Sequence, residues 1–139
     1  MNEVVVDASA ALRTLSAHEE GHAEAAELFG KLLPLGIEPI APDIFPYEVG
    51  NALRKSKGAA PVRTSLFLDA LQLVRIVPSG IDVLARAFGS ASKLSFYDAC
   101  YVELAETREA LLWTQDDAIL KAAPEIAFDT TRLRSRLRL

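Results

Sequence analysis

The feature that most constrains this chain is a short β-branched run that ends in an acid and passes directly into a helical stretch. Val4, Val5 and Val6 are continuously apolar, as in a strand that is buried on both faces. Asp7 follows at once, and aspartate is a favoured residue immediately before the first turn of a helix. A strand of this kind feeding a helix predicts a parallel sheet covered by helices on both faces.

The rest of the sequence repeats this alternation of strand and helix. Apolar segments predict four further short strands, at residues 37–41, 74–77, 110–113 and 126–128. The stretches between them predict further helices at residues 23–33, 43–58, 62–73, 81–91, 95–106 and 116–123. The predicted fold class is α/β, with a mostly parallel central sheet of about five short strands and helices on both faces. Ligands of such sheets bind at the carboxyl ends of the strands.

Composition indicates one folded domain over residues 1–139. Half of the residues are hydrophobic and 24% are charged, which is the balance of a globular chain. No apolar run approaches the roughly 20 residues that span a bilayer, and no basic segment precedes the first apolar run, so we expect a cytoplasmic protein with no membrane partner. The only cysteine, Cys100, excludes an internal disulfide framework and a multi-cysteine zinc site.

Charge is distributed unevenly along the chain. The 15 basic and 19 acidic residues give a net charge of −4, but four arginines lie in the last eight residues, at positions 132, 134, 136 and 138. The first 131 residues therefore hold 11 basic against 19 acidic residues, a formal charge of −8. An acidic body with a basic tail at 132–139 argues against a broad positive face for nucleic acid. It remains compatible with an enzyme whose acids are balanced by metal ions.

Four acids stand where predicted strands end or helices begin. These are Asp7, Glu48, Asp98 and Asp116. Each alone has an ordinary explanation as a helix cap, a dipole-stabilising acid or a solvated residue. Together, in largely apolar surroundings, four converging carboxylates would repel one another or protonate unless cations balanced them. Ligand sets made only of oxygen suit Mg²⁺ or Mn²⁺.

Four sequence blocks carry these acids. They are VVDASAAL at 5–12, YEVGNAL at 47–53, SFYDACYVELA at 95–105 and WTQDDAIL at 113–120. In this order and at these positions the blocks resemble the PIN-domain ribonucleases, and more narrowly the VapC-type toxins of toxin–antitoxin pairs. Because the resemblance extends over nearly the whole chain, it implies a single PIN-like nuclease domain.

The resemblance also implies the roles of individual residues. Its acidic site would consist of Asp7, Glu48, Asp98 and Asp116, holding one or two Mg²⁺ or Mn²⁺ ions. Ser9 and Thr114 match hydroxyl residues that orient carboxylates or water. Asp117 is either an extra ligand or a solvated helix residue. The implied reaction is hydrolysis of RNA phosphodiester bonds by water activated on the cations, without a side-chain nucleophile.

The implied partners are an RNA substrate, a cognate antitoxin protein and a second copy of the chain, for which residues 62–73 offer an apolar surface. Basic residues outside the acidic site are candidates for RNA binding, namely Arg54, Lys55, Lys57, Arg132 and Arg134. Two alternatives stay open. One is a housekeeping RNA-processing PIN nuclease without an antitoxin, and the other is a catalytically silent PIN fold that only binds RNA or protein.

Other motifs are less consistent with the sequence around them. HEEGH at 18–22 matches the H-E-x-x-H pattern of zinc proteases, but Gly21 interrupts the helix that this pattern requires. Phosphotransferases of the haloacid dehalogenase type need a second Asp where this chain has Ser9. No G-x-G-x-x-G follows the first strand, as a dinucleotide site requires. Cys100 has no histidine near it in sequence, so we expect a core residue rather than a nucleophile.

Overall fold

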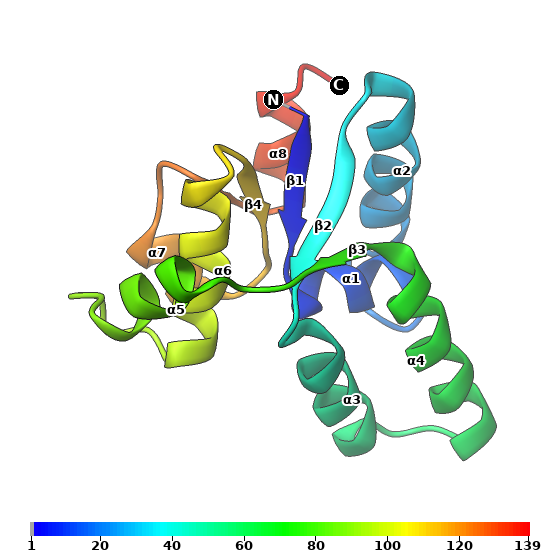
Figure 1. The fold of residues 1–139 in the computed structure, drawn as a ribbon. Coiled ribbons are helices and arrows are strands. Elements are labelled where there is room, and N and C mark those ends of the chain that lie inside the picture. Colours follow the sequence, from blue (N-terminus) through cyan, green and yellow to red (C-terminus); the bar gives the residue numbers. More distant parts are fainter. Residues whose placement is uncertain (1) are drawn as a thin grey trace.

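The computed structural model describes residues 2–139 and places a five-stranded sheet between two groups of helices (Figure 1). The elements in chain order are β1 (Glu3–Val6), α1 (Ala8–Leu15), α2 (His22–Leu32), η1 (Leu33–Leu35), β2 (Glu38–Pro42), α3 (Phe45–Lys55), α4 (Ala60–Leu73), β3 (Arg75–Val77), α5 (Ile81–Phe88), α6 (Phe96–Thr107), β4 (Leu111–Trp113), α7 (Asp117–Ala122), β5 (Ala127–Phe128) and α8 (Thr130–Arg136). The strand order is β3-β2-β1-β4-β5, and every neighbouring pair is parallel. The predicted α/β class, with its parallel sheet of five short strands, is confirmed.

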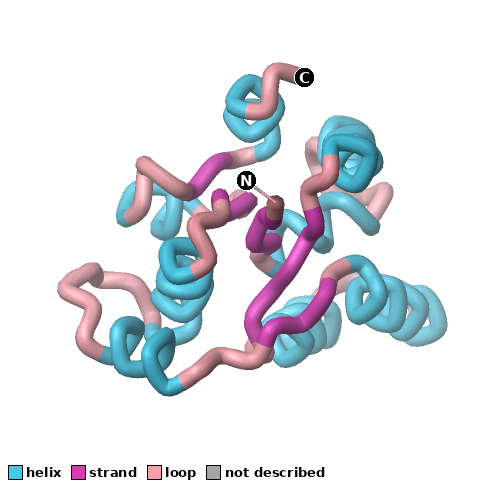
Figure 2. The backbone as a smooth tube through the Cα atoms, turned by 45° about the horizontal axis from the view of Figure 1, so that its top comes forward, coloured by secondary structure: helices cyan, strands magenta, loops and turns pink. Residues whose placement is uncertain are grey.

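The central position of β1 in the sheet explains why the sequence of this strand is apolar without alternation. Val5 of β1 lies opposite Ile40 of β2 and Leu112 of β4. Val4 and Val6 belong to a core shared with α1, α2, α3, α4 and α8, whereas Val5 belongs to a second core built with α5, α6 and α7. Successive side chains of a strand point to opposite faces, so both faces of β1 are covered and all three valines are buried. Figure 2 shows the helices on either side of the strands.

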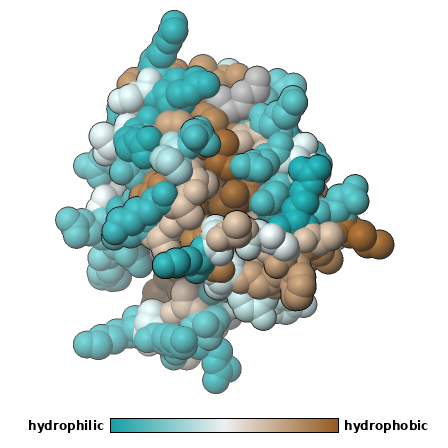
Figure 3. All heavy atoms as spheres, turned by 90° about the vertical axis from the view of Figure 1, so that its left-hand side faces the viewer, coloured by the Kyte–Doolittle hydropathy of each residue, from teal (hydrophilic) through white to brown (hydrophobic). Residues whose placement is uncertain are grey.

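The predicted helix at 81–91 is shorter in the structure. Helix α5 ends at Phe88, and the backbone N–H of Gly89 closes the last turn by donating to the carbonyl of Ala85. Two of its large apolar side chains, Ile81 and Phe88, are more than 80% exposed. On the side of the molecule that carries α5, α6 and α7, hydrophobic residues reach the surface among hydrophilic ones (Figure 3).

The expected basic tail is part of the fold. Residues 130–136 form α8, capped by Asp129, whose Oδ1 accepts from the backbone N–H of Arg132 at 2.8 Å. Leu133 is fully buried in the core, and Arg134 donates to Glu27 of α2 at 3.2 Å. Helix α8 lies at the end of the molecule away from α3 (Figure 1). None of the helices in the described range, 2–139, is long and apolar enough to cross a membrane.

Candidate active site

A pocket of about 420 Å³ brings together all four acids singled out from the sequence. Its lining consists of Asp7, Ala8, Ser9, Leu12, Arg13, Glu19, Glu48, Ala52, Asp98, Gln115 and Asp116. Asp7 follows β1 and Asp116 follows β4, and these two strands are parallel neighbours that end at the same edge of the sheet. Glu48 and Asp98 come from the first turns of α3 and α6. The topology therefore delivers carboxylates from distant parts of the chain to one place.

Asp7 is almost completely buried and is held by two hydroxyl groups. Its Oδ2 accepts hydrogen bonds from Ser9 Oγ at 2.8 Å and from Thr114 Oγ1 at 2.6 Å. Burial raises the pKa of Asp7 above its ordinary value, and these two hydrogen bonds oppose the rise. Because both bonds go to Oδ2, the lone pairs of Oδ1 stay available for another partner.

The same two hydroxyls tie the end of β1 to the end of β4. Ser9 Oγ accepts from the backbone N–H of Gln115 at 2.9 Å, and Thr114 Oγ1 accepts from that of Asp116 at 3.0 Å. Each hydroxyl thus donates to Asp7 and accepts from the turn that carries Asp116. This arrangement agrees with the orienting role that the family resemblance implies for Ser9 and Thr114.

Asp116 and Asp98 each take part in a helix start. Asp116 Oδ1 caps α7 by accepting from the N–H groups of Ala118 and Ile119, at 2.8 and 3.2 Å. The N–H of Asp98 donates to Ser95 Oγ, the cap of α6. Burial raises the pKa of Asp98, with repulsion from Asp116 and Asp7 adding to the rise. Asp117, which follows Asp116, is exposed and lies outside the pocket lining. This favours a solvated helix residue over an extra metal ligand at that position.

Glu48 is the most strongly perturbed acid of the pocket. Burial raises its pKa to about 7, and the charges of Asp7, Asp98 and Asp116 contribute further. The Tyr101 hydroxyl nearby opposes this rise, and its own pKa is raised by burial, so Tyr101 keeps its proton. Glu48 Oε1 and the Tyr101 hydroxyl are both buried without a hydrogen-bond partner. A buried carboxylate oxygen without a partner is costly, and a cation or water would satisfy it.

The donor set of the pocket fits a hard divalent cation. All four acids offer carboxylate oxygens, and burial together with repulsion between the acids raises the pKa values of Asp7, Glu48 and Asp98. Within residues 2–139, no three acidic, imidazole or thiol groups are arranged so that they could hold a metal ion directly. Mg²⁺ keeps several waters and needs only one or two carboxylates from the protein. The residues therefore fit an ion that is held in part through water.

The sequence did not lead us to three polar residues of the lining: Arg13, Glu19 and Gln115. Arg13 lies four residues after Ser9 on α1, so helical spacing places both side chains on one face. That spacing was a usable signal for Arg13. Glu19 lies in the turn before α2, where no periodicity indicates which way a side chain points.

His22 of the histidine motif and Cys100 have structural roles. His18 is exposed in the turn before α2, and His22 Nδ1 donates to the backbone carbonyl of Arg13 at 3.0 Å. Cys100 is buried beside Ala87 and Ala99. Neither histidine nor Cys100 lines the acidic pocket.

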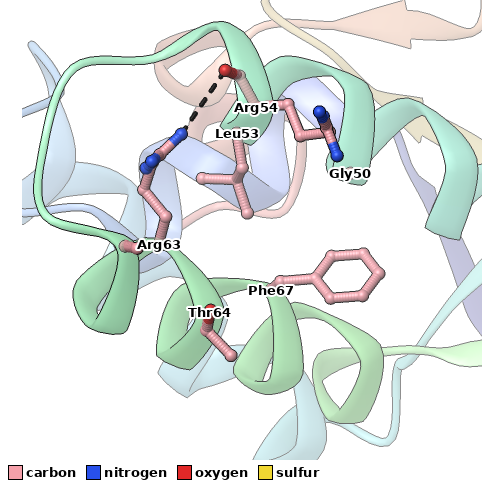
Figure 4. Close-up of a pocket in the computed structure, with 7 residues that line it drawn as sticks. Gly50, Leu53, Arg54, Arg63, Thr64 and Phe67 are labelled. Atoms are coloured by element: carbon pink, nitrogen blue, oxygen red, sulfur yellow. Dashed lines mark hydrogen bonds between the residues drawn. The ribbon is translucent and has the colours of Figure 1, made fainter.

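The basic candidates lie away from the acids. Arg54 lines a separate cavity of about 480 Å³ between α3 and α4, together with Leu53, Arg63 and Phe67 (Figure 4). Arg63 Nη1 donates to the carbonyl of Arg54 across this cavity at 3.4 Å. Residues 55 and 57 are exposed at the end of α3 and just after it. Helix α3 thus carries Glu48 in the acidic pocket and Arg54 in a different cavity.

The model of the PIN domain family matches residues 4–125 of this chain. The chain belongs to the PIN domain family, as the sequence blocks had indicated. It is 32% identical over 126 residues to Ribonuclease VapC3 of Mycobacterium tuberculosis (strain H37Rv), a match that covers 88% of each chain. The resemblance to VapC-type proteins is confirmed.

Two solved structures extend the comparison. PAE2754 from Pyrobaculum aerophilum superposes with a TM-score of 0.71 at 25% identity, covering 98% of this chain and 89% of its own. The toxin–antitoxin complex from Klebsiella pneumoniae contains a chain that superposes with a TM-score of 0.66 at 18% identity, covering 91% of this chain and 97% of its own. At 18% identity the second likeness concerns the fold alone.

Proposed function

We propose that this protein is an Mg²⁺- or Mn²⁺-dependent endoribonuclease and the toxin of a toxin–antitoxin pair. The observation that carries the proposal is the pocket in which four carboxylates from distant segments converge while the buried Glu48 Oε1 has no partner. The relative VapC3, which is named a ribonuclease and matches most of this chain, supports RNA as the substrate. The retained acids argue against the alternative of a silent binding module.

The side chains of the pocket have distinct tasks in this proposal. Asp7, Glu48, Asp98 and Asp116 hold one or two cations, directly or through water. Ser9 and Thr114 fix the carboxylate of Asp7, so that its free oxygen keeps one orientation. When bound, such a cation supplies neutralisation of the phosphate charge and a lowered pKa for the attacking water.

A cleavage assay with defined RNA tests the enzymatic part. Purified protein is incubated with single-stranded RNA in Mg²⁺, in Mn²⁺ and in EDTA, and the fragment ends are sequenced. We expect cleavage only with a divalent cation, giving 5′-phosphate and 3′-hydroxyl ends. Cleavage that continues in EDTA, or fragments with 2′,3′-cyclic ends, would contradict the mechanism.

We propose further that the antitoxin inhibits by placing a basic side chain, most simply an arginine, among the acids. An arginine fork pairs well with carboxylates, and the pocket concentrates negative charge. The Klebsiella pneumoniae structure is a toxin–antitoxin complex, so the fold that this chain shares with it occurs together with a protein partner of this type. Competition between antitoxin and Mn²⁺ binding tests the idea, and an Mn²⁺ affinity unchanged by saturating antitoxin would contradict it.

The remaining parts of the proposal concern assembly and location. Val62 and Leu68 of α4 are more than half exposed, which supports a homodimer through residues 62–73. Light scattering of the wild type and of Leu68→Glu tests this interface, since the introduced glutamate charge should reduce the measured mass from that of a dimer to that of one chain.

The proposal places the protein in the cytoplasm, where Cys100 stays reduced. An adjacent antitoxin gene distinguishes the toxin from a housekeeping RNA-processing nuclease.

A further inference from the structure

Arg13 is the only basic side chain among the described residues that line the acidic pocket. Five acids surround the same space, yet no carboxylate within residues 2–139 lies within 4.0 Å of its guanidinium. A positive group beside several acids but paired with none of them keeps its charge available for a ligand. The ligand that this charge favours is an anion entering the pocket.

The Arg13 side chain is held in place by a series of hydrogen bonds whose other members are uncharged side chains. Its Nη1 donates to Gln115 Oε1 at 3.3 Å, and Gln115 Nε2 donates in turn to Thr130 Oγ1 at 2.6 Å. Thr130 Oγ1 also accepts from Trp113 Nε1, a fully buried indole, at 3.1 Å. Gln115 thereby links the guanidinium of Arg13 to the end of β4 and the start of α8. The other four N–H groups of the guanidinium have no protein partner.

The turn before α2 leaves room for the same side chain. Gly21 has φ +80°, and a Cβ added there would lie 3.3 Å from both Cδ and Nη1 of Arg13. The ring of His22 meanwhile donates to the backbone carbonyl of Arg13. The glycine that breaks the apparent zinc-protease motif therefore has a positive explanation, because it accommodates an arginine that points into the acidic pocket.

We propose that Arg13 binds a non-bridging phosphate oxygen of the RNA strand in the acidic pocket. This inference rests on the proposed function and identifies the residue that positions the substrate. The planar guanidinium matches phosphate oxygens with two parallel N–H donors, and it partly offsets the repulsion between the RNA and the surrounding acids. Arg13 needs no metal for this contact, so its effect on binding can be measured without catalysis.

The test measures binding of a single-stranded RNA oligonucleotide in the Asp98→Asn background, with and without Arg13→Ala, over a series of salt concentrations. We expect Arg13→Ala to weaken binding about tenfold, the effect of one charge-assisted contact. The slope of log Kd against log salt should fall by about 0.7, as expected for one lost phosphate contact to a single strand. Arg13→Lys should restore the slope but only part of the affinity, because it keeps the charge and loses the fork.

Two further variants separate phosphate binding from a structural role. Arg86→Ala, at an exposed position of α5, removes the same charge and should leave affinity and slope unchanged. Gly21→Ala keeps every charge, crowds the Arg13 side chain at 3.3 Å and strains the turn at φ +80°, so it should weaken RNA binding in the direction of Arg13→Ala. A lowered thermal midpoint of Arg13→Ala with an unchanged salt slope would mean that Arg13 only supports the fold, and would overturn the inference. If the Asp98→Asn protein with Arg13 intact binds no RNA, the proposed function is overturned as well.

Discussion

The carboxylates of the pocket are unfavourable neighbours in the metal-free protein. Burial and mutual repulsion raise the pKa values of Asp7, Glu48 and Asp98, so each ionised acid makes folding less favourable than it would be in isolation. Groups kept for a ligand rather than for stability typically have this signature. A substitution that removes one of these carboxylates should therefore affect activity and stability in opposite directions.

Replacing one acid by its amide should separate activity from stability. We expect Asp98→Asn to abolish RNA cleavage while the thermal midpoint in EDTA stays equal or rises, because the amide removes repulsion from Asp116 and Asp7. Single-turnover cleavage and a thermal melt check this. The matched control is Asp117→Asn, at an exposed position outside the pocket, which should retain activity. Undiminished cleavage by Asp98→Asn would refute the assignment of the site.

The raised pKa of Glu48 predicts a dependence of stability on pH. The protonated form is favoured in the folded state, so its contribution is fully present below about pH 4.5 and is lost as pH rises through about 7. After allowance for solvent screening the loss is on the order of 1 to 2 kcal/mol. Thermal melts in EDTA at pH 5 and pH 8 should show a larger difference for the wild type than for Glu48→Gln. Equal differences in the two proteins would show that Glu48 does not titrate in this range.

The acids could be predicted from the sequence because parallel strands end at one edge, so Asp7 and Asp116 had to converge. For Arg13, helical spacing from Ser9 indicates the pocket face of α1 but does not determine where the guanidinium lies. Its position depends on the turn at Gly21 and on Gln115, and these contacts join segments that no local pattern relates. Long-range hydrogen bonds of this kind become visible only in the folded structure.

At the scale of elements, one threonine joins β4 to α8. Thr130 Oγ1 accepts from both Trp113 Nε1 and Gln115 Nε2. Thr130→Val keeps the shape of the side chain but leaves the buried indole N–H unpaired, which should lower the free energy of unfolding by about 1 to 3 kcal/mol. Thr131→Val, at the exposed neighbouring position, is the control and should change stability little. Chemical denaturation of both variants provides the measurement, and equal stabilities would mean that the hydrogen bonds to Thr130 contribute little.

Most elements follow from local signals, but the last helix did not. The strand at β1 and the helix starts at Ser95 and Asp116 are marked by apolar runs and capping residues. In the last eight residues the four arginines indicate a basic tail rather than a helix. The signals for α8 were present, since Asp129 is a capping residue and Leu133 and Leu137 are spaced by one helical turn. Burial of Leu133 outweighs the polar character of its neighbours.

At the scale of the molecule, the basic end remains a candidate for RNA binding, but α8 changes how that can be tested. Deleting residues 132–139 would remove the buried Leu133 and damage the fold. The better variant is Arg136→Gln with Arg138→Gln, two exposed positions. If both contact phosphates, the slope of log Kd against log salt should fall by about 1.4, with the single-turnover rate at saturating RNA unchanged.

The control for this experiment removes two positive charges elsewhere. Arg86→Gln with Lys93→Gln alters exposed positions on and after α5 and should leave the slope unchanged. Equal slopes for the wild type and the Arg136/Arg138 variant would remove these two arginines from the binding surface. Thr130 at the start of α8 bonds to Gln115 of the acidic pocket, whereas Arg136 and Arg138 lie at the last residue of α8 and just after it. A contact made by these two arginines would therefore be with RNA outside the pocket lining.

The pairing of β1 with β4 has a consequence for the synthesis of the protein. Asp7 leaves the ribosome more than 100 residues before its hydroxyl partner Thr114 and the fourth acid, Asp116. Until β4 is made, one edge of β1 has no neighbouring strand, and the acidic pocket lacks the lining residues that follow β4. A nascent chain that ends before residue 111 therefore contains three of the four acids and cannot assemble the pocket, so the complete site first exists after β4 and Asp116 have been made.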